Sequence, residues 1–503
     1  MDNPTFFLVL PFLLTFIYVF TISGRRNPHL PPGPRPFPII GNLLKLGNKP
    51  HRSLAALAKC YGPLMSLKLG SRTTIVVSSP DMAKEFFNKH DQAFSSRSLP
   101  ETARIMDHHK YSIAWLPAGD EWRKLRRMTK ECLFSVQCLD NSEQLRKKKI
   151  QELVDHVSGC CTNEKAINVG AIAFTTILNI LSNLLFSKDL SEYDSIPSHE
   201  FKNVIWGVME IGGKPNLVDF FPILKPLDPQ GLASQGNVYA MKLFAIFDAI
   251  IDKRLQTRAI SSSYDDDSST QNDVLDLLLN INFKDESEYS INDMKHLFTD
   301  LFIAGTDTVS TTLEWAMTEL IRNPKKLEIA RLELNKCMQK NGRFVTVQEH
   351  DISRLPYLHA IIKETLRLHP PAPFLIPHQA IHDVEVGGFV VPKDAQILCN
   401  VWAIGRDPKV WSKPEAFMPE RFLEVEIDYW GQDFELISFG TGRRICPGLN
   451  IAHRMLHTIL GSLIHNFDWK LEGNTKAQDL DMEEKFGLTL PRNVPLMAIP
   501  VKL

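Results

Sequence analysis

The chain has 503 residues, of which 44% are hydrophobic, and its formal net charge is −1. This length allows a large core, and no long break rich in glycine, proline or serine divides the middle of the sequence. The balanced charge excludes the basic field that nucleic-acid binding requires. The eight cysteines include no Cys-x-x-Cys pair for zinc or redox exchange, and their irregular spacing favours a reducing compartment.

The first predicted element is an apolar stretch at residues 4–22 that carries no charged side chain. About 20 apolar residues at a rise of about 1.5 Å match a hydrocarbon core near 30 Å. A cleaved signal peptide is the alternative, but the chain begins Met-Asp-Asn, where such a peptide has positive charge. Arg25 and Arg26 follow, which places the remaining chain in the cytoplasm. We therefore predict a retained membrane anchor over residues 1–24.

A basic, proline-rich hinge is predicted next, over residues 25–40, because its six prolines favour a stiff extended segment. Two runs rich in apolar and β-branched residues, 65–69 and 73–77, are joined by a Gly-Ser-Arg turn and predict a β-hairpin. Residues 81–89 predict a helix capped by Ser79. Residues 94–114 show little periodicity and predict a long loop.

A helix that begins near Trp122 carries a run of basic residues. Such runs usually form a solvated helix face. Trp122 and Arg126, however, are four residues apart and therefore share one face of the helix. Residues 165–260 have a mostly helical pattern that prolines interrupt, and the polar, acidic segment 261–270 predicts an exposed loop.

After a short amphipathic helix at residues 273–282, residues 292–322 predict a long helix through the core, because they contain no proline and repeat apolar residues at helical spacing. Gly305, Thr306, Asp307 and Thr308 interrupt its apolar face. Gly305 costs about 1 kcal/mol relative to alanine, so it requires a packing or functional reason. One interpretation is that Thr306 and Thr308 only bond back to the preceding helical turn.

Glu364 and Arg367 lie three residues apart on the next helix with a distinctive pattern. Alone, such a pair is a common surface ion pair of little energetic value. The segment Phe-Met-Pro-Glu-Arg-Phe, which contains Arg421, follows later in the chain.

The last motif is a tight turn at residues 439–448 that leads into an apolar helix. Gly440, Gly442 and Gly448 permit a close turn around Cys446. The helix N-terminus and the neighbouring Arg443 and Arg444 favour a thiolate that could bind a metal. A lone cysteine before an apolar helix is more often a small buried hydrophobe.

The spacing Phe-x-x-Gly-x-Arg-x-Cys-x-Gly is filled by Phe439, Gly442, Arg444, Cys446 and Gly448. It resembles the haem-binding signature of the cytochrome P-450 family. The resemblance implies a mainly α fold with small β-sheets, in which residues 41–503 form one large haem-thiolate monooxygenase domain behind the transmembrane helix. It also implies that Cys446 ligates the iron of haem b.

The resemblance further implies roles for the earlier motifs. Gly305, Asp307 and Thr308 match the family's oxygen-activating helix, with Thr308 and Asp307 guiding protons, although Val309 departs from the common pattern. Glu364, Arg367 and Arg421 match a buried structural triad. Residues implied to contact the haem or its propionates are Trp122, Arg126, His378, Phe439 and Arg444, and His378 stands where close plant relatives usually have arginine.

No flavin or nicotinamide fingerprint is present, so the resemblance implies that an NADPH-cytochrome P-450 reductase supplies electrons and that O₂ is a substrate. We expect Lys124, Arg127 and Arg443 to be docking charges for this partner. The anchor implies contact with membrane lipid, as a single-pass protein of the endoplasmic reticulum with a cytosolic catalytic domain.

Segments 219–231, 402–407 and 480–487 are similar to a plant subgroup that contains geraniol 8-hydroxylase, diterpenoid oxidases and tyrosine hydroxylases. We predict a pocket lined by Ile105, Ile113, Trp115, Trp206, Leu301, Ala304, Phe374, Leu375 and Phe486. This wall favours a small apolar terpenoid, with a geraniol-like monoterpenol preferred over a diterpenoid. Because His108, His109 and Lys110 are polar, a phenolic substrate such as tyrosine remains an alternative.

Two other functions remain as alternatives at this point. A thiolate-haem isomerase or dehydratase needs no reductase, and the presence of Gly305, Asp307 and Thr308 argues against it. A membrane-anchored haem sensor without turnover has no use for an oxygen relay.

Overall fold

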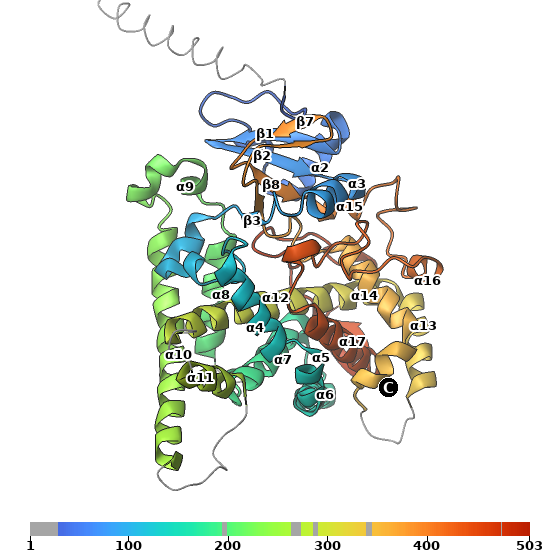
Figure 1. Ribbon diagram of the computed structural model, residues 1–503. Coiled ribbons are helices and arrows are strands. Elements are labelled where there is room, and N and C mark those ends of the chain that lie inside the picture. The colour runs from blue at the N-terminus through green and yellow to red at the C-terminus, as the bar shows by residue number, and fades with distance from the viewer. Residues whose placement is uncertain (1–28, 194–198, 263–272, 285–289, 339–344, 474) are drawn as a thin grey trace, which may run out of the picture.

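The computed structural model describes residues 29–193, 199–262, 273–284, 290–338, 345–473 and 475–503. The predicted anchor, the start of the hinge and most of the predicted loop 261–270 lie outside these residues. Helices form most of the described chain, and the largest sheet lies at one end of the molecule (Figure 1). The predicted mainly α architecture with small sheets is therefore confirmed.

The largest sheet has the strand order β1-β2-β8-β5-β3. Its first two strands form the predicted antiparallel hairpin, and β8 pairs with β2 in parallel. The strands of this sheet are β1 (Leu64–Leu69), β2 (Arg72–Val77), β8 (Gln396–Cys399), β5 (His378–Gln379) and β3 (Ser96–Arg97). A second sheet contains β4 (Ile167–Asn168), β10 (Met497–Lys502) and β9 (Phe467–Leu471), and β6 (Val384–Val386) pairs with β7 (Phe389–Val391).

The described part of the proline-rich hinge lies on the first sheet. Ser66 of β1 donates a backbone hydrogen bond to the Pro32 carbonyl at 2.8 Å and a hydroxyl hydrogen bond to the Pro31 carbonyl at 2.6 Å. Because proline has no N–H but keeps its carbonyl, the segment can join a sheet edge as an acceptor. The hinge is thus held to the domain at these two positions.

The described residues form sixteen α-helices. They are α2 (Pro50–Tyr61), α3 (Pro80–Lys84), α4 (Asp120–Cys132), α5 (Val136–Asn141), α6 (Glu143–Thr162), α7 (Val169–Phe186), α8 (His199–Gly213), α9 (Leu217–Phe220), α10 (Leu232–Ser262), α11 (Val274–Lys284), α12 (Ile291–Arg322), α13 (Pro324–Cys337), α14 (Pro356–Leu368), α15 (Val401–Ile404), α16 (Arg421–Glu424) and α17 (Leu449–Asn466).

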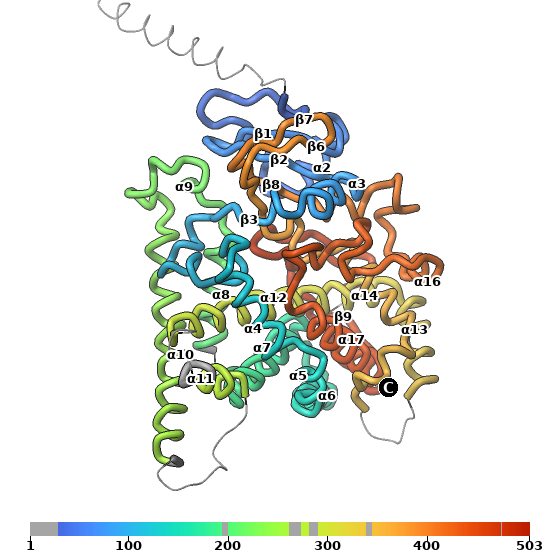
Figure 2. Tube along the Cα trace, viewed as in Figure 1, coloured from blue at the N-terminus to red at the C-terminus, as the bar shows by residue number. Residues whose placement is uncertain are grey.

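The long helix α12 crosses the centre of the molecule, as its pattern predicts (Figure 2). Ser290 and Asp293 form a capping box at its start, which satisfies free N–H groups of the first turn. It packs against α7, α14 and α17. Among the described residues, only α7 is long and apolar enough to cross a membrane, but 78% of it is buried, so it is a core helix.

The predicted loop at residues 94–114 is only partly irregular. It contains strand β3 and a 3₁₀ segment, η3 (Glu101–Lys110), which kinks at Met106 and Asp107, where φ is 49° and 60°. Short 3₁₀ turns have no 3.6-residue periodicity, so a search for helical spacing misses them. The predicted helix at 81–89 is also present, as α3 followed by a π-helical turn, η2 (Glu85–Lys89).

Candidate functional site

A cavity of about 610 Å³ lies between the middle of α12 and the turn that precedes α17. Its lining is mainly apolar, and Cys446, Ala304 and Thr308 all reach it. The cavity thus brings together the α12 motif and the Cys446 turn, which lie far apart in the sequence.

The Cys446 turn depends on its glycines. Gly440 and Gly442 have φ of 72° and 62°, which side chains disfavour. A Cβ at Gly442 would lie 2.9 Å from the Phe87 carbonyl oxygen. Cys446 donates its backbone N–H to the Phe439 carbonyl at 2.9 Å, which closes the turn around the sulfur.

The Cys446 thiol has a raised pKa, because burial outweighs the hydrogen bond from Gly448 and the charge of Arg126. This differs from the expectation of a thiolate stabilised by the helix end and Arg443. Arg443 instead pairs with Asp91 at 2.6 Å on the surface. A coordinated cation would hold such a buried sulfur as thiolate, so the environment of Cys446 is compatible with a metal ligand.

Three buried or half-buried arginines lie near one another in the lining of the cavity: Arg97, Arg126 and Arg444. Among the described residues, none of them forms an ion pair with a carboxylate. Burial and mutual repulsion lower the pKa of Arg97 well below its usual value and lower that of Arg444 to about 10. Nε of Arg97 is buried and has no hydrogen-bond partner. Such a cluster fits a ligand with more than one negative charge, as the two propionates of haem b have.

The sequence reasoning missed Arg97, which lies in β3 within the predicted loop. No motif surrounds it, and the only sequence signal is an arginine flanked by serines. Its burial becomes visible only when β3 pairs with β5.

Two predicted propionate contacts have other partners in this structure. Trp122 donates its indole N–H to the Ile113 carbonyl at 3.1 Å, and the Arg444 guanidinium lies over its ring at 4.4 Å. His378 donates Nδ1–H to the Phe94 carbonyl at 2.6 Å, and burial followed by Arg97 lowers its pKa well below 6.5. Nε2 of neutral His378 is then an acceptor, so the predicted donation to a propionate does not follow from this arrangement.

The predicted oxygen-activating segment of α12 has two distinct surroundings. Thr308 lines the cavity and donates its hydroxyl to the Ala304 carbonyl at 2.7 Å, and Thr306 bonds back in the same way to Phe302. Asp307 accepts a hydrogen bond from the Thr489 hydroxyl, and burial raises the pKa of its carboxyl group.

Gly305 permits a close approach of two helices. A Cβ there would lie 2.7 Å from a terminal methyl of Leu181 on α7. The close approach of α7 to α12 therefore gives one packing reason for the glycine, since a side chain here would displace the Leu181 methyl.

Glu364, Arg367 and Arg421 lie together in a buried network, not in a surface ion pair. Arg367 donates two hydrogen bonds to the Glu364 carboxylate at 2.7 and 2.8 Å, and Arg421 donates at 3.2 Å. Neither side chain of the Glu364–Arg367 pair is exposed. Ser438, just before the thiolate turn, donates its hydroxyl to the Leu366 carbonyl on the same helix at 3.0 Å.

All but one of the predicted substrate-contacting residues line the cavity: Ile105, Ile113, Trp115, Leu301, Ala304, Phe374, Leu375 and Phe486. The prediction for Trp206 is wrong, because its side chain is 56% exposed and packs on Phe174 at a ring distance of 6.1 Å. Helix α8 instead turns Val208 and Ile211 toward the cavity.

A polar cluster interrupts the apolar wall. His108 of η3 lies 2.9 Å from His296 of α12, Nδ1 to Nδ1, and 3.0 Å from the Asp300 carboxylate. Ser112 and the Ile113 backbone also donate to Asp300, each at 2.8 Å. Nε2 of His296 is buried and has no partner, and burial lowers the pKa of His296 to about 4. The sequence reasoning noted His108 but missed its partners on α12.

The sequence model of the family described as Cytochrome P450 matches residues 31–497. Cytochrome P450 76T24 from Catharanthus roseus is 54% identical over 97% of this chain and 96% of its own length. Geraniol 8-hydroxylase from the same plant is 48% identical over the full length of both chains. Ferruginol synthase from Isodon rubescens is 47% identical over 96% of each.

Proposed function

This chain belongs to the cytochrome P450 family, and we propose that it hydroxylates a small apolar alcohol, with a geraniol-like monoterpenol as the preferred substrate. The family and the relatives establish the coarser activity, that of a monooxygenase of plant specialised metabolism. The finer assignment rests on the residues that line the cavity.

Haem b is the cofactor of the family, and the donor set fits it. Cys446 would hold the iron, and Arg97, Arg126 and Arg444 would neutralise the propionates. When bound, the haem activates O₂ with electrons that a reductase takes from NADPH. The protein supplies positive charge for the propionates and a mainly apolar cavity for the substrate.

We assign proton handling to α12 and to the C-terminal loop. The raised pKa of Asp307 lets its carboxyl group hold and release a proton, and the Thr489 hydroxyl fixes its orientation. Thr308 presents its hydroxyl oxygen at the cavity wall as an acceptor, because its proton is donated to the Ala304 carbonyl. Gly305 serves both by allowing α7 to approach this part of α12.

The observation that carries the substrate proposal is the unpartnered Nε2 of His296 in an otherwise apolar wall. A hydroxyl group can donate or accept, so it pairs with this nitrogen whichever tautomer His296 adopts. The remaining carbon skeleton of a monoterpenol suits the apolar lining. The alcohol end would thus be held at His108 and His296, away from the carbon that reacts.

Tyrosine fits this cavity less well. Its ammonium group needs a carboxylate, and the described lining offers Asp219 and Asp300. Asp300 already accepts from three groups, and Asp219 accepts the Glu101 N–H and lies 3.7 Å from Arg72. A diterpenoid remains the second candidate, because a ferruginol synthase is among the similar proteins.

We also propose a membrane-bound location at the endoplasmic reticulum, through an anchor at residues 1–24. Exposed apolar side chains support this: Ile39 is 76% exposed, Ile223 is 86% and Leu227 is 73%. The β1–β2 turn is joined to the end of α9, since Ser71 donates to the Phe220 carbonyl at 2.8 Å. These apolar residues therefore belong to neighbouring segments that could contact lipid together.

Spectroscopic titration of the membrane-expressed protein tests the substrate. The reduced carbon monoxide complex should first show the thiolate Soret band. Geraniol should then produce a high-spin shift, and NADPH with reductase should yield a hydroxylated product. A shift with an abietane diterpene or tyrosine alone would refute the monoterpenol assignment. Turnover without NADPH would instead indicate an isomerase or dehydratase.

A further inference from the structure

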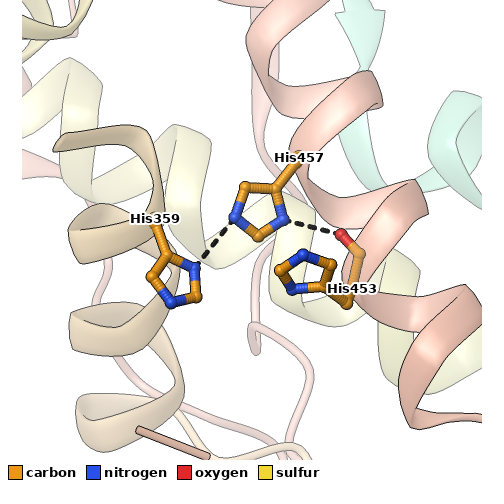
Figure 3. A group of neighbouring side chains, drawn as sticks. All are labelled: His359, His453 and His457. Atoms are coloured by element: carbon orange, nitrogen blue, oxygen red, sulfur yellow. Dashed lines mark hydrogen bonds between the residues drawn. The ribbon is translucent and has the colours of Figure 1, made fainter. Parts of the chain in front are cut away.

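Three histidines gather outside the main cavity, between α14 and α17 (Figure 3). His359 comes from α14, and His453 and His457 lie one turn apart on α17. One ring nitrogen from each lies within 4.8 Å of the others. None of these residues has a role in the monooxygenase site described above.

The hydrogen bonds fix where two of the rings carry their protons. His457 Nδ1 lies 2.6 Å from the His453 carbonyl, which can only accept, so Nδ1 is the donor. His359 Nε2 lies 2.9 Å from the Asp428 carboxylate and is likewise a donor. The remaining nitrogens, Nδ1 of His359 and Nε2 of His457, are 3.0 Å apart. In neutral rings both carry lone pairs, so the contact is favourable only with a cation between them.

His453 completes a set of three donors. Its Nδ1 lies 2.7 Å from the Tyr429 hydroxyl, which also lies 3.5 Å from His359 Nδ1, so Tyr429 borders the same space. The His453 and His457 ring centroids are 4.3 Å apart.

We propose that His359, His453 and His457 form a binding site for a divalent transition metal, namely zinc. Three imidazoles and a water are an established zinc donor set, with Zn–N distances of about 2.0–2.1 Å. A tetrahedral site therefore places its nitrogens about 3.3 Å apart, close to the 3.0 Å between His359 and His457. The His359–Asp428 hydrogen bond supplies the carboxylate partner that commonly orients a metal-binding imidazole.

A route from solvent leads to the site. His359 and His453 line a second cavity, whose rim includes Asp140, Glu143 and Glu349. Arg454 also lines it and pairs with Asp140 and Glu349. Arg146 also pairs with Glu349, and the three rim carboxylates exceed these two arginines by one charge, which favours entry of a cation.

The metal would join two helices that support the thiolate turn. Helix α14 carries Glu364 and Arg367, and α17 begins three residues after Cys446. A shared ion would therefore stabilise the backbone beneath the haem site without touching substrate. The expected consequence is greater thermal stability of the loaded protein, with substrate binding unchanged.

Metal analysis of the purified, haem-loaded full chain tests this proposal. After treatment with a chelator and incubation with zinc, the protein should hold one zinc per chain in addition to its haem iron. His359→Gln and His453→Gln should each lose this zinc and the associated rise in melting temperature. His350→Gln is the matched control, because His350 lines the same cavity but is not in the cluster and is 72% exposed.

Asp428→Asn gives a second measurement that keeps all three ligands. Loss of the orienting carboxylate should weaken zinc binding by about 10- to 100-fold. Zinc-free wild-type protein after incubation, or equal zinc in wild type and both histidine variants, would overturn the site. In that case the His359–His457 contact holds a shared proton instead.

Discussion

The network behind the Cys446 turn, here called the proximal side, and the η3–α12 wall of the cavity, here called the distal side, use their polar groups in opposite ways. On the proximal side, Glu364 and Arg367 are unexposed and satisfy each other with two hydrogen bonds. On the distal side, His296 lines the cavity with a nitrogen that has no partner. A paired region holds one geometry, whereas an unpaired group can bind an incoming molecule. The first region therefore holds the Cys446 turn in place, and the second selects the substrate.

Among the variants considered, Glu364→Ala should have the largest effect, and it tests the supporting role of the proximal side. It leaves Arg367 as a buried charge without its carboxylate, which costs about 3–5 kcal/mol. We expect loss of haem during purification and a lower melting temperature. Glu415→Ala is the control, because Glu415 is 73% exposed where it pairs with Arg406 and should contribute less than about 1 kcal/mol. Normal haem content in Glu364→Ala would contradict the supporting role.

Arg97→Leu should separate haem binding from stability. In the haem-free protein, the substitution removes a buried arginine whose Nε is unpartnered, so stability should stay level or rise. In the loaded protein it removes a charge-assisted contact worth about 1.5–3 kcal/mol, or about 10- to 100-fold in haem affinity. Haem titration and thermal unfolding of both forms measure the two effects. Arg123→Leu, at a 56% exposed surface position, should change neither.

The sequence predicted the proximal side better because its constraints are local. Cys446 lies among glycines required by the turn, and Glu364 and Arg367 are one helical turn apart. The distal wall combines residues from η3, α8, α12 and the C-terminal loop, and no spacing in the sequence encodes their mutual distance. Trp206 was misplaced because an amphipathic helix shows its apolar stripe but not which neighbour each residue of the stripe meets. Arg97 was missed because only strand pairing buries it.

His296→Leu tests whether the unpartnered nitrogen on the distal side binds the substrate hydroxyl. Loss of the acceptor should weaken geraniol binding by about 10-fold, as expected for a net hydrogen bond of about 1.4 kcal/mol. Binding of myrcene, a hydrocarbon of similar size without a hydroxyl, should be unchanged or stronger. Spectral titrations with the two ligands give the difference directly. An equal loss for both would show that His296 only shapes the wall.

Thr489→Val should change the pH dependence of turnover more than it changes the binding of geraniol. The Thr489 hydroxyl lowers the pKa of Asp307, although burial raises it by more. Without that donor the pKa of Asp307 rises further, so the ionised carboxylate forms only at higher pH. The acid limb of the turnover profile should shift upward, while the geraniol spectral titration stays constant. A profile unchanged across the acid range would separate Asp307 from proton handling.

Trp206→Ala should have the smallest effect, and it tests whether Trp206 lies outside the distal wall. Its side chain is 56% exposed, so its removal should change stability by less than about 0.5 kcal/mol. Product distribution should also stay constant, because Trp206 does not line the cavity. Leu301→Ala is the matched comparison, since Leu301 is 8% exposed and does line it. Regioselectivity depends on placement of the substrate to within fractions of an ångström, so only the second variant should alter the product ratio.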